Sequence, residues 1–426
     1  MSEGTQNKPP VFKISFFYGW IILGLVCCVG FVRQAPAVAT LSIFVNPMID
    51  EFGWSRLGLS GAVSLGGVLA AIVSPMIGSF MDRHGPRVIL CFAVVLTGIA
   101  CLSLSLSQDL IFFYIFFCIA RMSFAGPFDL GIYGVVNNWF IRRRPFATAI
   151  ANLFQAFGLA CMPLIASTAI LWGDWRTGWL TVGIVVFSVG LIPTYFLKPR
   201  RPEDIGLFPD GDLKIEFNAM ENESAIPSQL GRDFSRASAL RTRGFWMLSL
   251  FTLFVFPVQA GVSLHQAPHL LQLGFTATES ATVVSLFSLS AAGMTLLTGL
   301  LGRKFSLSTL LAISGAFLCL STFLMLSIET FLEGLTCGMI FGAALGAILT
   351  LLPVAWADFF GRKNYGAIRG LALAIQVVAQ AAGPLISGIL WDLEKNYFAS
   401  LELFTVFSFC AFIAAFFAQP PKKIDS

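Results

Sequence analysis

The hydrophobic pattern of this chain is a series of long apolar runs separated by short polar or charged segments. Each run is close to the roughly 20 apolar residues that an α-helix needs to cross the hydrocarbon core of a bilayer. The runs lack the strict alternation of apolar and polar residues that is typical of membrane β-barrel strands. They predict twelve membrane-crossing helices, within residues 16–47, 56–81, 88–106, 110–140, 146–172, 178–197, 245–273, 277–301, 307–328, 333–357, 370–391 and 401–418.

One polar stretch, residues 198–243, interrupts the series after the sixth run. It predicts a linker between two six-helix halves, 17–197 and 244–418, with short tails at 1–16 and 419–426. The halves resemble each other, because Phe140-Ile-Arg-Arg and Phe360-Gly-Arg-Lys occupy equivalent loops. Internal duplication of this kind is typical of secondary transporters, whose binding sites lie near the membrane midplane between the repeats.

Composition agrees with an all-α membrane protein and excludes other classes. Apolar residues make up 56% of the chain and charged residues 12%, whereas a soluble domain is about one quarter charged. A soluble enzyme, a nucleic-acid-binding protein and a disordered chain are therefore excluded. The 9 Cys all lie in apolar runs without a C-x-x-C pair, and only 3 His accompany them. No metal site or cofactor is expected.

The distribution of Lys and Arg predicts the orientation. Outside the runs, the side opposite the termini carries only Arg56, Arg176 and Lys395, and the other loop residues, among them Arg362, Lys363 and Arg369, are assigned to the side of the termini. By the positive-inside rule, both termini are expected in the cytoplasm. The first run continues past Ala37-Val38-Ala39, which favours a membrane helix over a cleaved signal peptide.

The loop between the second and third runs reads Gly78-Ser-Phe-Met-Asp82-Arg83-His84-Gly85-Pro86-Arg87. This loop resembles the signature G-x-x-x-D-R-x-G-x-R of the major facilitator superfamily. The resemblance implies two six-helix bundles that rock about a central site. A carboxylate and arginines at helix ends pair with each other and with helix dipoles. We therefore expect a conformational latch, whose members are Gly78, Asp82, Arg83, Gly85, Arg87, Arg142 and Arg143. The equivalent loop of the second half keeps Gly299, Arg303 and Lys304 without an Asp.

A longer motif, Asn138-Trp-Phe-Ile-Arg-Arg-Arg-Pro-Phe-Ala147, resembles the monocarboxylate transporter family and its bacterial relatives, including oxalate/formate-type exchangers. Tyr18-Gly-Trp20, Glu51-Phe-Gly-Trp-Ser-Arg56 and Asp358-Phe-Phe-Gly-Arg362 fit the same group. The resemblance implies transport of small organic anions, often with protons. Pro36 is followed by Ala37 where animal members have Lys, and 281–301 has no charge, so lactate or pyruvate does not follow as the substrate.

Two arginines within predicted spans are the main candidates for binding an anion. Arg33 is assigned to the middle of the first span and Arg121 to the middle of the fourth. A charge inside a span needs a partner or a wet cavity, and a guanidinium can form two parallel hydrogen bonds with a carboxylate. A purely structural ion pair is the alternative. Secondary candidates are the amides of Asn152, Gln155, Gln259, Gln376 and Gln380, which could equally join helices.

Three further side chains are candidates for proton coupling. Asp129 lies eight residues beyond Arg121, about 12 Å along a helix, so a direct pair within that helix is not expected. Asp129 is a proton carrier, a partner for another helix, or a residue facing cytoplasmic water. His265 and His269 share a helix face near the outer end, where imidazole can sense pH or simply form a polar outer mouth.

These observations predict a secondary transporter of small organic anions in the cytoplasmic (inner or plasma) membrane, favouring proton symport. Its partners are an organic anion, protons and the lipid bilayer. Anion exchange, export of neutral or drug-like solutes, and a membrane sensor that does not transport remain alternatives. A membrane enzyme is disfavoured, because the sequence has no Ser/His/Asp arrangement, phosphate-binding loop or metal cluster.

Overall fold

The computed structural model describes residues 17–197, 201–211, 233–302 and 305–421. Its described residues form helices and connecting turns without a β-strand, which confirms the all-α prediction. Within them, 11 helical segments are long and apolar enough to cross a membrane. The predicted tail 1–16, much of the predicted linker, Arg303, Lys304 and residues 422–426 lie outside the described residues.

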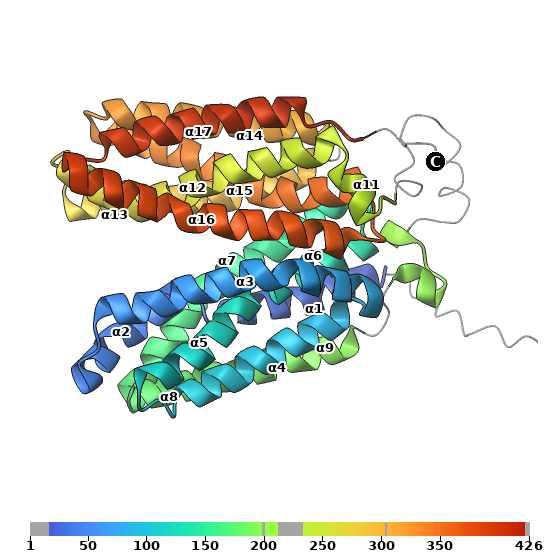
Figure 1. Ribbon diagram of the computed structural model, residues 1–426, viewed down its shortest axis with the longest axis horizontal. Coiled ribbons are helices and arrows are strands. Elements are labelled where there is room, and N and C mark those ends of the chain that lie inside the picture. Colours follow the sequence, from blue (N-terminus) through green and yellow to red (C-terminus); the bar gives the residue numbers. More distant parts are fainter. Residues whose placement is uncertain (1–16, 198–200, 212–232, 303–304, 422–426) are drawn as a thin grey trace, which may run out of the picture.

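Two bundles of helices lie side by side (Figure 1). The first contains α1 (Gly19–Val32), α2 (Val38–Phe52), α3 (Arg56–His84), α4 (Pro86–Leu104), α5 (Leu110–Ala125), α6 (Pro127–Trp139), α7 (Arg144–Trp172), α8 (Trp175–Val185) and α9 (Ile192–Phe196), with a π-helical stretch at Val186–Leu191. The second contains α12 (Arg243–Gln272), α13 (Ala277–Leu301), α14 (Leu307–Leu324), α15 (Phe331–Phe360), α16 (Tyr365–Glu394) and α17 (Phe398–Phe417), preceded by the short α11 (Arg236–Leu240).

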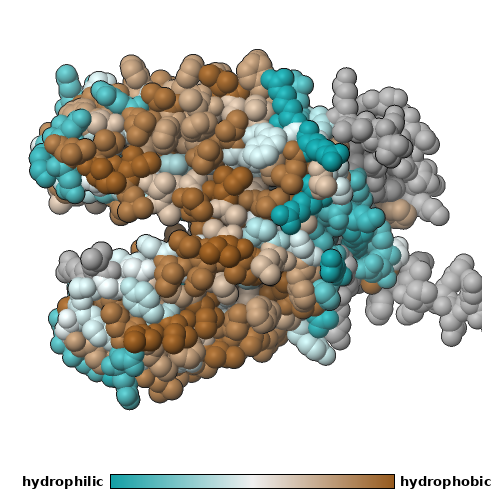
Figure 2. All heavy atoms as spheres, in the orientation of Figure 1, coloured by the Kyte–Doolittle hydropathy of each residue, from teal (hydrophilic) through white to brown (hydrophobic). Residues whose placement is uncertain are grey.

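The two ends of the molecule differ from its sides. Figure 2 shows apolar residues over the sides of both bundles and polar residues gathered at the two ends, as expected for a protein surrounded by lipid. We call the end formed by 78–87, 138–146, 201–211, 233–244 and 358–367 the linker end. The opposite end, formed by 53–55, 172–174, 274–276 and 328–330, is the far end.

Local sequence explains where the helices start. Side-chain oxygens accept a hydrogen bond from a backbone N–H in the first turn of many of them, which satisfies a donor that has no partner within the helix. These capping residues are Ser55, Asp109, Asp174, Thr242, Thr276, Ser306 and Thr330.

Two predicted spans are interrupted, and the prediction of single helices there is wrong. The first span is split into α1 and α2 by a turn at 33–37, and the fourth into α5 and α6 at Gly126. In the first break, the Thr40 hydroxyl donates to the Gln34 carbonyl oxygen, which the turn has released from the helical pattern. In the second, Pro127 begins α6, where its missing N–H costs nothing. Hydropathy did not show these breaks because the surrounding residues stay apolar.

Close contacts between backbones join the two bundles toward the linker end. Helices α3 and α16 pack together there, and so do α7 and α13. A side chain on Gly78 would collide with the carbonyl of Gly366, and one on Gly370 with the carbonyl of Ser74. Toward the far end the two bundles are separated by a cleft, which Figure 2 shows between the lobes.

Candidate functional site

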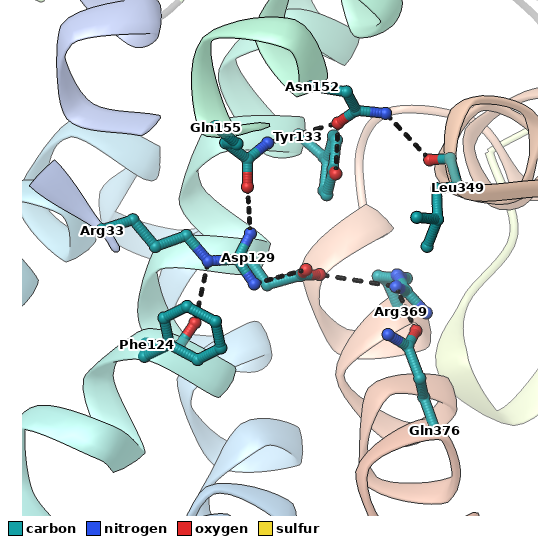
Figure 3. A network of polar contacts seen from close by, with 9 residues as sticks. All are labelled: Arg33, Phe124, Asp129, Tyr133, Asn152, Gln155, Leu349, Arg369 and Gln376. Carbon is teal, nitrogen blue, oxygen red and sulfur yellow. Dashed lines mark hydrogen bonds and ion pairs between the residues drawn. The ribbon is translucent and has the colours of Figure 1, made fainter. Parts of the chain in front are cut away.

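The first break in the helices places an arginine in the interior of the molecule. Arg33 follows the last residue of α1 and is 9% exposed. Its Nε donates to the carbonyl oxygen of Phe124 at 3.0 Å, and Nη1 donates to Oε1 of Gln155 at 2.5 Å. The guanidinium also lies over the Phe124 ring, 4.8 Å from its centroid. Arg33 is therefore fixed by groups of α5 and α7 (Figure 3).

The second break supplies the carboxylate. Asp129 is in the first turn of α6 and is 5% exposed. An acidic side chain is favoured there because the helix N-terminus carries partial positive charge. Its Oδ2 is 3.2 Å from Nη2 of Arg33. The structure shows Asp129 paired with residues of other segments of the chain. The Asp129 side chain is buried and does not face water.

Arg369 brings the second half to the same carboxylate. It lies in α16, is 2% exposed, and its Nη2 is 3.4 Å from Oδ1 of Asp129. The same nitrogen donates to Oε1 of Gln376 at 2.7 Å, seven residues further along α16. Asp129 thus lies between two arginines, one from each bundle (Figure 3). The assignment of Arg369 to a polar loop is wrong, because α16 begins four residues before it.

Amide and hydroxyl groups extend this network to α15. Gln155 Nε2 and the Tyr133 hydroxyl both donate to Oδ1 of Asn152, at 3.2 and 2.7 Å. Asn152 Nδ2 in turn donates to the carbonyl oxygen of Leu349 at 3.0 Å. The contact from Asn152 to Leu349 is a second polar link between the two bundles.

Arg121 adds a third guanidinium beside this network. Its carbon Cζ is 4.4 Å from the centroid of the Phe124 ring, the ring that Arg33 also contacts. Nη1 lies 3.5 Å from the carbonyl oxygen of Pro36, and Nε has no partner among the described residues. The cluster therefore contains three arginines and one aspartate, of which Arg33 and Arg369 contact the aspartate, and it has a surplus of positive charge.

Polar contacts also join the two bundles at the linker end. Asp82 accepts hydrogen bonds from the backbone N–H groups of Gly366 and Ala367, at 2.8 and 2.7 Å, in the first turn of α16. Arg144, at the start of α7, forms an ion pair with Asp358 of α15. Each contact joins the first bundle to the second.

The remaining amide and histidine candidates lie apart from the arginine cluster. Gln380 Nε2 donates to Oε1 of Gln259 at 3.2 Å, so these two residues join α16 to α12. His269 is buried, with Nε2 at 3.1 Å from the Met325 carbonyl oxygen. The His265 ring contacts Tyr397, and within the described residues no third His, Cys, Asp or Glu completes a metal site.

Comparison with known proteins identifies the family to which this architecture belongs. The sequence model of the Major Facilitator Superfamily matches residues 22–330 and 261–426. The chain belongs to the Major Facilitator Superfamily. Like its relatives, it is therefore a membrane transporter and not an enzyme.

Two relatives of this superfamily member confirm the resemblance noted from the sequence. Monocarboxylate transporter 7 of Homo sapiens is 23% identical, over 92% of this chain and 86% of the relative. The oxalate:formate antiporter of Oxalobacter formigenes is 24% identical, over 96% and 94%. Among solved structures, the superfamily transporter FucP in its outward conformation aligns with a TM-score of 0.70 and 12% identity, over 94% of this chain and 99% of that one.

Other members of the superfamily signature lie at the linker end in different roles. Arg87 donates to the Thr194 carbonyl oxygen at 3.3 Å, within the first bundle. Gly85 caps α3 with a φ of 90°, a conformation that favours glycine. Arg83 is exposed. Gly78 permits the contact of α3 with α16 described above.

The other two predicted latch arginines interact through their backbone. The N–H groups of Ile141, Arg142 and Arg143 donate to the carboxylate of Asp210, at 3.1, 2.7 and 3.0 Å. Asp210 belongs to the predicted linker, so one end of this segment is held on the first bundle. Asp233 accepts from the backbone N–H of Lys363 in the equivalent loop of the second bundle, at 3.1 Å.

Sequence reasoning missed Arg369, Arg144, Asp358 and Asp210 as members of this arrangement. A signal for two of them was present in the transporter's motifs. Arg144 and Asp358 lie in the quoted motifs, but the sequence assigns Arg144 only to the side of the termini. The 2% exposure of the Arg144 side chain shows that one of them is buried.

Proposed function

We propose that this transporter carries small organic anions across the cytoplasmic membrane by alternating access, with its linker end facing the cytoplasm. The observation that carries the proposal is the meeting of arginines from both bundles at Asp129. The orientation is supported by the basic residues of the linker end, among them Arg83, Arg142 and Lys363.

The charge balance of the cluster favours an anion as the ligand. Arg33 and Arg369 contact Asp129, and Arg121 shares the Phe124 ring with Arg33, so the cluster holds three positive charges and one negative charge. Buried charge without a counter-charge is costly in a membrane interior. A bound carboxylate reduces the surplus, whereas a neutral solute leaves it unchanged.

Free hydrogen-bond donors provide the means of binding. Arg369 is 2% exposed, yet its Nε and Nη1 have no partner among the described residues. Nε of Arg121 is also buried without a hydrogen-bond partner among the described residues. Arginine N–H groups bind carboxylates in pairs, so we propose Arg369 as the principal substrate-binding residue. Arg33, Arg121, Gln155 and Gln376 are the further candidates.

Asp129 supplies a route to proton symport. In this state it contacts Arg33 and Arg369 together. A substrate carboxylate on Arg369 takes the place of Asp129, which then accepts a proton from the side on which the site is open. The proton and the anion thus enter the site together. His265 and His269 stay secondary candidates for proton coupling, because they lie outside the cluster.

Anion exchange is the second candidate, and the same charge surplus favours it. A carrier that changes conformation while empty keeps uncompensated arginines in the membrane interior, whereas an exchanger changes conformation only with an anion bound. The name of one relative, oxalate:formate antiporter, describes such an exchange. The two mechanisms share the binding site and differ in the coupling.

The test is uptake of labelled lactate, pyruvate, acetate and oxalate into proteoliposomes. Accumulation that requires an inward proton gradient supports symport, and flux that requires a second anion inside supports exchange. Folded protein that takes up none of the four overturns the substrate class. Binding without any flux would instead identify a membrane sensor.

Removal of single charges tests the site. For the substrate that the assay identifies, we expect R369Q and R33Q each to lower uptake about 10–100-fold, the equivalent of a lost charge-assisted hydrogen bond or two. The matched control is K363Q, which removes an exposed positive charge at the linker end. Equal uptake by R369Q and K363Q would exclude Arg369 as the principal substrate-binding residue.

A further inference from the structure

A groove at the linker end lies outside the transport site. It has a volume of about 340 Å³ and lies between the start of α12 and the end of α17. Arg241 and Arg243 line one side, and Phe417, Gln419 and Pro420 line the other. Figure 1 shows α11, which leads into this groove, at the end of the second bundle.

Both arginines of the groove are available to a ligand. Arg241 and Arg243 are exposed, and neither forms an ion pair with a carboxylate in the part of the chain that the structure describes. The guanidinium of Arg243 lies 5.2 Å from the centroid of the Phe417 ring. This contact leaves the edge of the guanidinium, which bears its N–H groups, open to an anion.

The groove lies where a phospholipid headgroup is found. α12 and α17 are both long and apolar enough to cross a membrane, and the groove is formed where α12 begins and α17 ends. Trp246, one turn into α12, is 52% exposed, and Phe417 is 45% exposed. Tryptophan on an outer face at this depth is typical of the membrane–water interface.

We propose that this groove binds the phosphate headgroup of an anionic phospholipid. Arg241 and Arg243 contact the phosphate, while Phe417 and Pro420 contact the glycerol backbone and the first carbons of the acyl chains. Basic pockets between membrane helices on the cytoplasmic side bind anionic headgroups in this way. Only the assignment to the cytoplasmic leaflet rests on the orientation proposed above, since the binding itself requires no transport.

The experiment measures lipid bound to the purified full chain in detergent by native mass spectrometry. The probes are phosphatidylglycerol, which is anionic, zwitterionic phosphatidylcholine, and soluble glycerol phosphate. We expect phosphatidylglycerol to bind in preference to the other two. R241Q and R243Q should each weaken this binding about fivefold, because one arginine near an anionic headgroup contributes about 1 kcal/mol.

K363Q is the matched control, since Lys363 is exposed at the linker end and does not line the groove. Unchanged thermal unfolding of each variant without added lipid shows that it is folded. Equal binding of phosphatidylglycerol by R241Q, R243Q and the unmodified protein would overturn the proposal. Equal binding of glycerol phosphate and phosphatidylglycerol would overturn the lipid as the occupant. No outcome depends on the transport assay.

Discussion

Asp129 is the residue on which the central network depends. It contacts Arg33 within its own bundle and Arg369 of the other bundle. Its removal therefore leaves two buried guanidiniums with fewer partners, and it breaks a link between the halves. A buried ion pair is weak support for stability by itself, but loss of one partner is costly.

We expect a double-mutant cycle to detect this coupling. D129N and R369Q should each lower the resistance of the protein to unfolding in detergent. The double variant should lose less than the sum, by about 0.5–3 kcal/mol, because the two groups are in direct contact. A matched cycle of D129N with K363Q should be additive, since Lys363 is exposed at the linker end. An additive result for Asp129 and Arg369 would mean that the contact between them, at 3.4 Å, does not contribute to stability.

Residue roles were only partly predictable from the sequence. Arg33 stood out because a charge within an apolar run requires a partner. Its partners Asp129 and Gln155 are 96 and 122 residues away, and no local pattern connects them. Arg369 was hidden because it follows a basic loop, and only the early start of α16 moves it into the interior.

Helix contacts depend on residues that lack side chains. Gly342 and Gly346 of α15 face the backbone of α13, so a Cβ at Gly342 would collide with the carbonyl of Phe287. Small residues are typical of such close approaches in membrane bundles. The pair α13 and α15 is therefore held by shape and backbone contact.

Alanine at two glycines should separate packing from helix propensity. G342A should lower the thermal stability of the purified protein, because its methyl group displaces α13. G388A is the control, since a Cβ at Gly388 in α16 meets nothing within 4 Å. It should be neutral or stabilising by up to about 1 kcal/mol, the usual gain of Gly to Ala within a helix. Equal effects of the two changes would contradict this account.

The capping contact of α16 makes a second prediction for an element. D82N removes the charge that the Gly366 and Ala367 N–H groups bind. We expect the linker end to open more often, about two- to fivefold, since a carboxylate at a helix N-terminus contributes about 0.3–1 kcal/mol.

Spin labels at His84→Cys and Lys363→Cys, both exposed and in different bundles, would report this opening as a longer label-to-label distance. The background protein should have its native cysteines replaced. D392N is the control, because Asp392 is exposed and pairs with Lys395 of the same bundle. A distance distribution of D82N identical to that of D392N would refute the role of Asp82.

Element boundaries followed from hydropathy where nothing interrupts a helix. The predicted 277–301 has the same bounds as α13, because Thr276 caps its start and the apolar run ends with it. The breaks at 33–37 and Gly126 could not be predicted in this way. They depend on Pro36 and Pro127 together with distant partners such as the Phe124 carbonyl oxygen.

At the scale of the whole molecule, the structure has its linker end closed. The polar links between bundles run from Asp129 and Arg369 at the centre to Asp82 and Gly366 at the linker end. The proposed alternating access requires these links to break together as the far end closes. Near the linker end, the ion pair of Arg144 and Asp358 contains a buried arginine.

We expect D358N to open the linker end more than D82N does. Arg144 has a side chain that is 2% exposed. Without Asp358 its side chain keeps, among the described residues, the carbonyl oxygens of Phe140 and Asn137 as partners. Truncation of one partner of a buried charged pair costs about 2–5 kcal/mol. The same pair of spin labels measures the effect, and D392N is again the control. A smaller shift than that of D82N would contradict the assigned importance of this ion pair.

The two halves differ in how their first and fourth crossings are built. The first and fourth crossings are interrupted in the first half, whereas their counterparts α12 and α15 are unbroken helices of 30 residues. The interruptions expose the carbonyls of Pro36 and Phe124, which hold Arg121 and Arg33. A substitution at either interruption would therefore shift an arginine of the first half without altering a helix of the second half.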